Sequence, residues 1–100
     1  KVKDYVMRNY KNPEISLTSA AEFASVSTGY LSGLFKKEAG TNFVKYLTDV
    51  RMEKSMQLLR STDMKTYEIA YETGFSNPHY FSVSFKKYTG MSPSEFRAKE

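Results

Sequence analysis

Two pairs of adjacent lysines, Lys36-Lys37 and Lys86-Lys87, lie in two segments of the chain that resemble each other. The segments read YLSGLFKKEAG and YFSVSFKKYTG, and the second begins fifty residues after the first. Lysine ammonium groups bind phosphate oxygens, and the serine hydroxyls in both segments can form hydrogen bonds with a polar partner. This combination, present twice, favours a polyanionic partner.

The two segments, residues 30–40 and 80–90, belong to a longer internal repeat. Upstream the match continues with an offset of forty-nine residues, which pairs Ala21 with Ala70. The change of offset places one extra residue in the second copy, at the Ser76-Asn77-Pro78 turn. The chain therefore holds one structural unit twice.

The composition excludes several classes of function. The 100 residues include no cysteine and one histidine, His79, so a thiolate metal site, a cysteine nucleophile or a Ser/His/Asp triad has almost no material. There is no glycine-rich phosphate loop and no apolar run near the eighteen or so residues of a membrane span. We expect no enzyme activity, cofactor, metal or membrane insertion. The net charge of +4 agrees with a polyanionic partner, although many other domains are equally basic.

Apolar periodicity and capping residues predict an all-α fold of seven helices, with no segment that alternates like a strand. The expected helices span residues 2–10, 17–24, 28–39, 42–60, 67–73, 78–88 and 93–99. The expected N-caps include Ser16, Thr66, Asn77 and Ser92. A short helix, a tight turn at residues 25–27 and a second helix together form the helix-turn-helix pattern.

The longest expected helix, residues 42–60, carries two apolar stripes. The first stripe contains Phe43, Leu47, Val50 and Leu58, and the second contains Met52, Met56 and Leu59. A helix that is apolar on two sides packs against two partners. We therefore predict one domain, residues 1–100, in which helix-turn-helix subdomains at 1–41 and 62–100 are joined by a linker helix at 42–61.

The two helices that contain the lysine pairs have one apolar face and one small, polar face. The expected buried residues are Leu31, Leu34 and Phe35 in the first helix, and Phe81, Ser84 and Phe85 in the second. The outward faces contain no acidic residue, which suits a helix lying in the major groove of DNA. Taken once, such a face is more typical of a solvated surface, and its repetition favours the DNA interpretation.

The candidate DNA contacts form two groups. The candidates for base contacts are Thr28, Gly29, Ser32, Gly33, Lys36, Pro78, His79, Ser82 and Val83. The candidates for phosphate contacts are Ser27, Tyr30, Lys36, Lys37, Ser76, Asn77, Tyr80, Lys86 and Lys87. The two tyrosines are expected to pack at the edge of the core, with the hydroxyl reaching a phosphate. For His79, simple exposure to solvent is nearly as good an explanation.

With these residues in view, the whole chain resembles the DNA-binding domain of the AraC/XylS family of bacterial transcription regulators. The family's hallmark is two helix-turn-helix units on one connecting helix. The matching residues include Ser16-Leu17, Ala21, YLSGLFKKEAG, Tyr46-Leu47, Arg51-Met52, Ile69-Ala70, Gly74-Phe75-Ser76, Tyr80-Phe81-Ser82, Phe85-Lys86-Lys87, Gly90-Met91-Ser92-Pro93 and Phe96-Arg97.

The resemblance implies a homeodomain-like fold and sequence-specific binding to double-stranded DNA. Helices 28–39 and 78–88 would read two successive major-groove segments, and the protein would be cytoplasmic and associated with the nucleoid. Family members usually carry a separate sensing, dimerisation or receiver domain. Because the chain begins at Lys1 rather than Met, we interpret it as a piece of a longer protein that holds such a domain.

Three positions depart from the family pattern. Arginine is common in the family where this chain has Gly33 and Val83, and glycine is usual where it has Ser25. Arginine is the main bidentate reader of guanine, so we expect binding here to depend on phosphates, small contacts and DNA shape. The alternative function is a helical protein-interaction domain that has lost DNA readout.

The charged residues outside the two lysine-containing helices also have two interpretations. For Arg51 we expect a salt bridge to Glu22, Glu38 or Asp49 in preference to a phosphate contact. The acidic residues Glu53, Glu68 and Glu72 are either solvated helix faces or part of a surface for a partner such as RNA polymerase.

Overall fold

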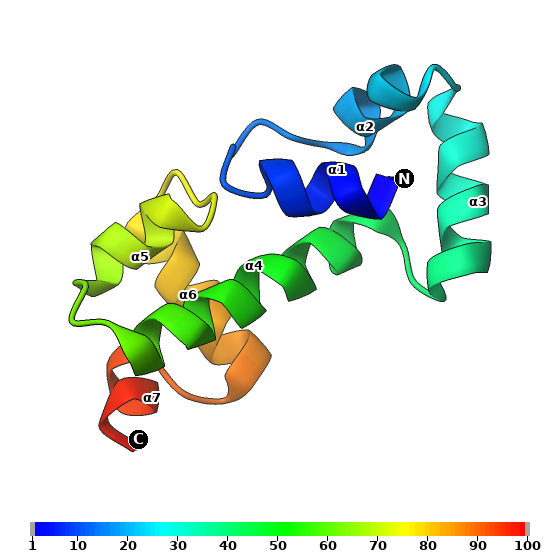
Figure 1. The fold of residues 1–100 in the computed structure, drawn as a ribbon. Coiled ribbons are helices and arrows are strands. Elements are labelled where there is room, and N and C mark those ends of the chain that lie inside the picture. The colour runs from blue at the N-terminus through cyan, green and yellow to red at the C-terminus, as the bar shows by residue number, and fades with distance from the viewer. Residues whose placement is uncertain (1, 100) are drawn as a thin grey trace.

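The computed structural model describes residues 2–99, and within that range it contains seven α-helices and no strand (Figure 1). The helices are α1 (Val2–Asn9), α2 (Leu17–Ala24), α3 (Thr28–Ala39), α4 (Phe43–Ser61), α5 (Thr66–Glu72), α6 (Pro78–Thr89) and α7 (Pro93–Lys99). The predicted all-α class is confirmed, and each predicted helix end lies within one residue of the observed end. The molecule is elongated, with extents of 43 × 22 × 21 Å.

Helix α4 carries a separate hydrophobic core on each of its halves. Figure 1 shows α1 to α3 around its N-terminal half and α5 to α7 around its C-terminal half. The first core consists of Val6, Ile15, Ala20, Ala21, Leu31, Phe35, Phe43 and Leu47. The second core consists of Met52, Leu59, Ile69, Ala70, Phe75, Phe81, Phe85 and Phe96.

The two cores are displaced along the axis of α4 as well as around it. Val50 packs against the first core, whereas Met52 belongs to the second, and two residues turn roughly 200° around a helix. The prediction that Leu58 shares a partner with Phe43 is wrong, because Leu58 packs against the second core. A helical wheel shows the angle of a residue but not its position along the axis, and here the axial position decides its partner.

The two helices that contain the lysine pairs, α3 and α6, begin and end in the same way. Ser27 and Asn77 are the N-caps, and the side-chain oxygen of each accepts a hydrogen bond from the backbone amide three residues later, at 3.1 and 3.0 Å. Gly40 and Gly90 end the helices in the left-handed conformation, with φ of 73° and 87°. These caps satisfy backbone groups that a helix end leaves without an intrahelical partner.

The start of α5 differs from the prediction. The helix begins at Thr66, so the expected N-cap role of Thr66 is wrong. Lys65 occupies the cap position, and its backbone N–H donates to the carboxylate of Glu68 at 2.8 Å. A glutamate in the first turn therefore takes part of the capping role that was expected of a hydroxyl.

The start of α7 agrees with the predicted capping box. The Ser92 amide donates to Oε1 of Glu95 at 2.8 Å, and the Glu95 amide donates to Oγ of Ser92 at 3.1 Å. Two amides at the helix end are thus satisfied reciprocally. Ser16 and Ser19 form the equivalent arrangement at the start of α2.

Candidate nucleic-acid interface

The outward face of α3 is open to solvent along its whole length. The buried residues of α3, Leu31 and Phe35, lie on the opposite side of the helix and pack into the first core. The candidate contact residues of this helix and its cap are all exposed: Ser27, Thr28, Gly29, Tyr30, Ser32, Gly33, Lys36 and Lys37. The side of α3 on which the sequence placed the contacts is therefore accessible to a partner.

The corresponding face of α6 is also accessible. Phe81 and Phe85 are fully buried in the second core. Most of the candidates on α6 and its cap are exposed, namely Ser76, Asn77, His79, Tyr80, Val83, Lys86 and Lys87, while Pro78 and Ser82 are half-buried. Ser84, which was expected to be buried, is likewise half-buried.

A shallow hollow brings the outward residues of α6 together. It is lined by His79, Ser82, Val83, Lys86, Lys87 and Ser92. Ser92, the residue before α7, was not among the predicted contacts. The local signal was the shortness of the Gly90-Met91 connection, which returns the chain to the lysine end of α6. The hollow thus has hydroxyls, an imidazole and two ammonium groups around the exposed methyl groups of Val83.

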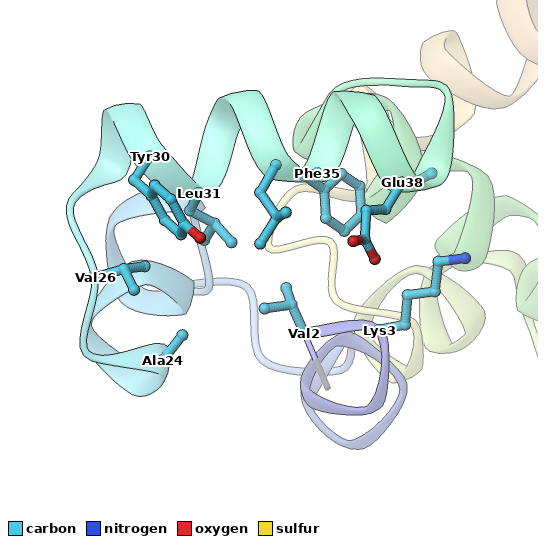
Figure 2. A pocket seen from close by; sticks show the side chains of 10 residues that line it. Val2, Lys3, Ala24, Val26, Tyr30, Leu31, Phe35 and Glu38 are labelled. Carbon is cyan, nitrogen blue, oxygen red and sulfur yellow. The ribbon is translucent and has the colours of Figure 1, made fainter.

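Both tyrosines lie farther out than predicted. Tyr30 is 60% exposed and Tyr80 is 63% exposed, so the expected packing at the edge of the core is wrong for most of each ring. The ring of Tyr80 keeps one aromatic neighbour, Phe75, at 6.4 Å between centroids. The ring of Tyr30 lines an apolar groove together with Val26 and Leu31 (Figure 2), and the ring of Tyr80 lines a hollow that also includes Thr48 of α4.

Leu34 was expected to be buried and is 37% exposed. It lines an apolar groove of about 380 Å³ between α1, the turn after α2, and α3. Figure 2 shows Val2 and Lys3 of α1 facing Leu31 and Phe35 of α3 across this groove. Because α1 does not fill the space beside α3, the apolar side of α3 remains partly uncovered.

The lysine pairs keep their charge available on the surface. Within residues 2–99 the ion pairs join Lys11 to Glu72 at 2.7 Å and Lys45 to Asp49 at 3.2 Å. Lys86 acts on a nearby carboxyl group: the hydrogen bonds from Ser92, and to a smaller extent the charge of Lys86, lower the pKa of Glu95. The charges of the lysine pairs are not neutralised by a described ion pair, which suits a role in binding an anion.

The helix starts add backbone donors to these lysines. In α3 the N–H groups of Thr28 and Gly29 have no carbonyl acceptor within the helix, and they point out of its amino end. In α6 the first position is Pro78, which has no N–H, and His79 supplies the corresponding donor. Each helix can therefore contact an anion at both ends.

Arg51 does not form the expected salt bridge. Its Nε donates to the carbonyl oxygen of Tyr10 at 3.0 Å, and a terminal guanidinium nitrogen donates to the carbonyl oxygen of Asn12 at 3.0 Å. Pairing with Glu22, Glu38 or Asp49 was therefore the wrong prediction. The sequence could not show that the turn after α1 brings two backbone carbonyls to the middle of α4.

The acidic residues have different surroundings. Glu72 pairs with Lys11, Glu68 accepts the hydrogen bond at the start of α5, and Glu53 is exposed. Across residues 2–99 there is no group of three or more His, Cys, Asp or Glu side chains arranged to hold a metal ion. None of the described helices combines the length and apolar character needed to cross a membrane.

Two short helix-turn-helix units on one shared helix, each with an accessible and basic second helix, define the class of helix-turn-helix DNA-binding domains. A family model described as a helix-turn-helix domain matches residues 20–99. The chain belongs to the AraC/XylS family of helix-turn-helix transcription regulators.

The relatives of the chain are regulators too. It is 48% identical over 92 residues to the transcriptional regulatory protein YesN of Bacillus subtilis, and the match covers 89% of this chain and 25% of that protein. The C-terminal domain of AraT, a response regulator of Geobacillus stearothermophilus, has a TM-score of 0.97 at 40% identity, covering 99% of this chain and 82% of that one. The C-terminal domain of the response regulator yesN of Fusobacterium nucleatum has a TM-score of 0.94 at 38% identity, covering 96% and 93%. The chain spans a quarter to about a third of the length of the curated relatives it matches.

Proposed function

We propose that this chain is the DNA-reading domain of a bacterial transcription regulator, and that α3 and α6 enter two successive major-groove segments of one duplex. The observation that carries the proposal is the arrangement of two accessible, basic helices on the two halves of α4, whose 19 residues span about 28 Å. One turn of DNA is about 34 Å. In Figure 1 both helices run downward, α3 beside the N-terminal end of α4 and α6 across its C-terminal half.

The proposed domain organisation follows the two cores. Residues 1–41 and 62–100 form the two helix-turn-helix subdomains, and residues 42–61 form the linker helix. Each core is completed by one half of α4, so neither subdomain has a full core without it.

In each subdomain we assign the contacts by position on the reading helix. The caps, the tyrosines and the lysine pairs face phosphates, while the middle of each outward face lies against base edges. Val83 would touch a thymine methyl group, and His79 and Ser82 would form hydrogen bonds with base edges. The absence of arginine at Gly33 and Val83 leaves phosphate contacts and DNA shape with a large share of the binding free energy.

The test is selection of bound sequences from a random duplex library at physiological salt. We expect a bipartite site whose two halves are centred about one helical turn apart. Enrichment of a single short site, or of no site, would contradict reading in two grooves.

The second candidate function is a helical protein-interaction domain. It is favoured by one observation, the small or apolar side chains at Gly33 and Val83 where a guanine-reading arginine is common in the family. This alternative requires that the chain show no saturable binding to any duplex at low salt, which a titration with fluorescent DNA measures directly.

Further partners of the parent protein are also proposals. The solved relatives include C-terminal domains of response regulators, which supports a receiver or sensing domain in the protein that carries this chain. RNA polymerase would be a second partner, contacting the exposed carboxylates of Glu53 or Glu68. The DNA-bound protein would lie with the chromosome in the cytoplasm. Crosslinking of the DNA-bound chain to purified polymerase tests the contact.

A further inference from the structure

Arg51 lies where three parts of the chain meet. It is in the middle of α4, and it donates hydrogen bonds to the carbonyl oxygens of Tyr10 and Asn12, in the turn that follows α1. On another side its guanidinium lies 5.8 Å from the ring centroid of Phe75, in the turn between α5 and α6. One side chain thus bridges the first subdomain, the linker helix and the second subdomain.

Gly74 brings the backbone of the second subdomain into the same place. Its φ of +97° is a conformation that side-chain-bearing residues rarely adopt. A Cβ atom at this position would clash with the carbonyl oxygen of Tyr10 and would lie 2.6 Å from Nε of Arg51. The α5–α6 turn therefore rests directly on the turn after α1, and only glycine allows this approach.

We call the place where these segments meet the joint (Tyr10, Asn12, Arg51 and Gly74). An ion pair between the two subdomains lies beside it: Lys11 of the first turn pairs with Glu72 of the second subdomain at 2.7 Å. Burial lowers the pKa of the Arg51 guanidinium, and the two carbonyl acceptors offset the loss of water around it. The hydrogen bonds of the joint connect α4 to the first subdomain, and the close approach of Gly74 and the ring of Phe75 add the second subdomain to it.

The joint matters because the two hydrophobic cores have no residue in common. Long helices curve, and α4 alone would therefore leave the angle between the subdomains adjustable. A second contact between the subdomains, away from the axis of α4, restrains this angle. Helix α6 also lies beside α4, because Thr48 of α4 and Tyr88 of α6 line the same surface hollow.

We propose that Arg51 is a positioning residue that sets the angle between α3 and α6, and thereby the spacing of the two half-sites that the chain accepts. This inference rests on the proposed reading of two grooves. Two reading helices held at a fixed angle bind their second half-site at a high effective concentration. A loosened joint distributes the second helix over more positions, so correctly spaced DNA is bound less tightly and incorrectly spaced DNA is penalised less.

The test compares Arg51→Met with a matched control, Arg97→Met. Arg97 also donates to two backbone carbonyls, those of Leu59 and Thr62, but these contacts lie between α7 and the end of α4, on the side of the second core. Affinities are measured for the best bipartite site, for the same site with one or two base pairs inserted or removed between the halves, and for each half-site alone.

For Arg51→Met we expect roughly a tenfold loss on the best bipartite site, half-site affinities within about twofold of the original, and a flatter dependence on spacing. For Arg97→Met we expect equal losses at every spacing. Arg51→Lys, which keeps the charge and one donor group, should recover part of the spacing dependence. A spacing profile that is unchanged in Arg51→Met would overturn the inference.

A second measurement needs no DNA and so separates this inference from the proposed function. The chain has no cysteine, so cysteines introduced by Glu22→Cys in α2 and Tyr71→Cys in α5 take spin labels at two exposed positions. The distance distribution between the labels should be narrow with Arg51, broad in Arg51→Met and narrow again in Arg97→Met. Equal widths in all three proteins would refute the bracing role, whether or not the chain reads two grooves.

Discussion

Gly33 lies on the exposed side of α3, and a Cβ atom added there meets no other atom within 4 Å. Glycine inside a helix costs about 1 kcal/mol relative to alanine, so Gly33→Ala should raise the free energy of unfolding by about that amount in urea denaturation. Gly33→Arg should in addition create a preference for guanine at one base pair, worth about 1–3 kcal/mol. If library selection returns the same site for both variants, Gly33 does not face the bases.

Ser25, in the turn between α2 and α3, is the one residue other than glycine with positive φ in the described range, at φ 60°. The left-handed conformation costs a residue with a side chain roughly 1–2 kcal/mol, and glycine adopts it freely. Ser25→Gly should raise the free energy of unfolding by about 1 kcal/mol after the added freedom of the unfolded chain is subtracted. The same replacement inside α3, Ser32→Gly, should lower the free energy of unfolding by about 0.5 kcal/mol. Thermal unfolding of both variants checks this opposition of signs.

The residues that line the hollow on α6 are expected to make two kinds of contact, with phosphates and with base edges. Lys86 is exposed near the end of the helix, where its ammonium group would neutralise a phosphate, so Lys86→Ala should weaken binding to all sequences about equally. His79 and Val83 are exposed on the outward face, and their replacement by alanine should change preference at particular base pairs. Binding to a panel of single-base variants of the selected site measures both effects. If Lys86→Ala instead changed the preference at particular base pairs, Lys86 would contact a base and the assignment of phosphate and base contacts would be wrong.

At the scale of the elements, α7 depends on its capping box. The hydrogen bonds from Ser92, followed by the charge of Lys86, hold the pKa of Glu95 below its ordinary value of 4.5. A carboxyl group whose pKa is lowered by folding stabilises the fold above its unfolded-state pKa, and this contribution disappears as pH falls through the folded-state pKa. Glu95→Gln keeps the hydrogen-bond acceptor but removes the charge.

We therefore expect Glu95→Gln to be less stable than the original chain near neutral pH and to approach it as pH falls below 4.5. Unfolding midpoints across this range measure the difference. A constant gap between the two proteins at all pH values would show that the charge of Glu95 makes no contribution.

Helices α3 and α6 show how far an element can be predicted from local sequence. Their limits, caps and terminal glycines follow from Ser27, Asn77, Gly40 and Gly90, because capping depends on residues within one turn of the helix end. Burial was predicted less well. Leu34 lies on the apolar side of α3, yet its exposure depends on how closely α1 approaches, which no local pattern specifies.

At the scale of the whole molecule, the excess of positive charge and the two basic faces act together. If about six phosphates are neutralised, the logarithm of affinity should fall with the logarithm of salt concentration with a slope of roughly −5. Titrations between low and physiological salt measure this slope, and Lys36→Ala should reduce its magnitude by about 1. A slope near zero would contradict a phosphate-dependent mode of binding.

The sequence alone determined the duplicated unit, the seven helices, most of the caps and the sides on which the two basic helices are exposed. Each of these features depends on residues that are close together in the chain, where periodicity and capping chemistry act. The tertiary structure decided which half of α4 each apolar residue serves, how far Tyr30 and Tyr80 extend into solvent, and that Arg51 bonds to the carbonyls of Tyr10 and Asn12 instead of a carboxylate. The physical reason is that these features depend on contacts between distant parts of the chain, such as Arg51 with Tyr10 and Asn12, and the geometry of such contacts exists only after the helices have packed together.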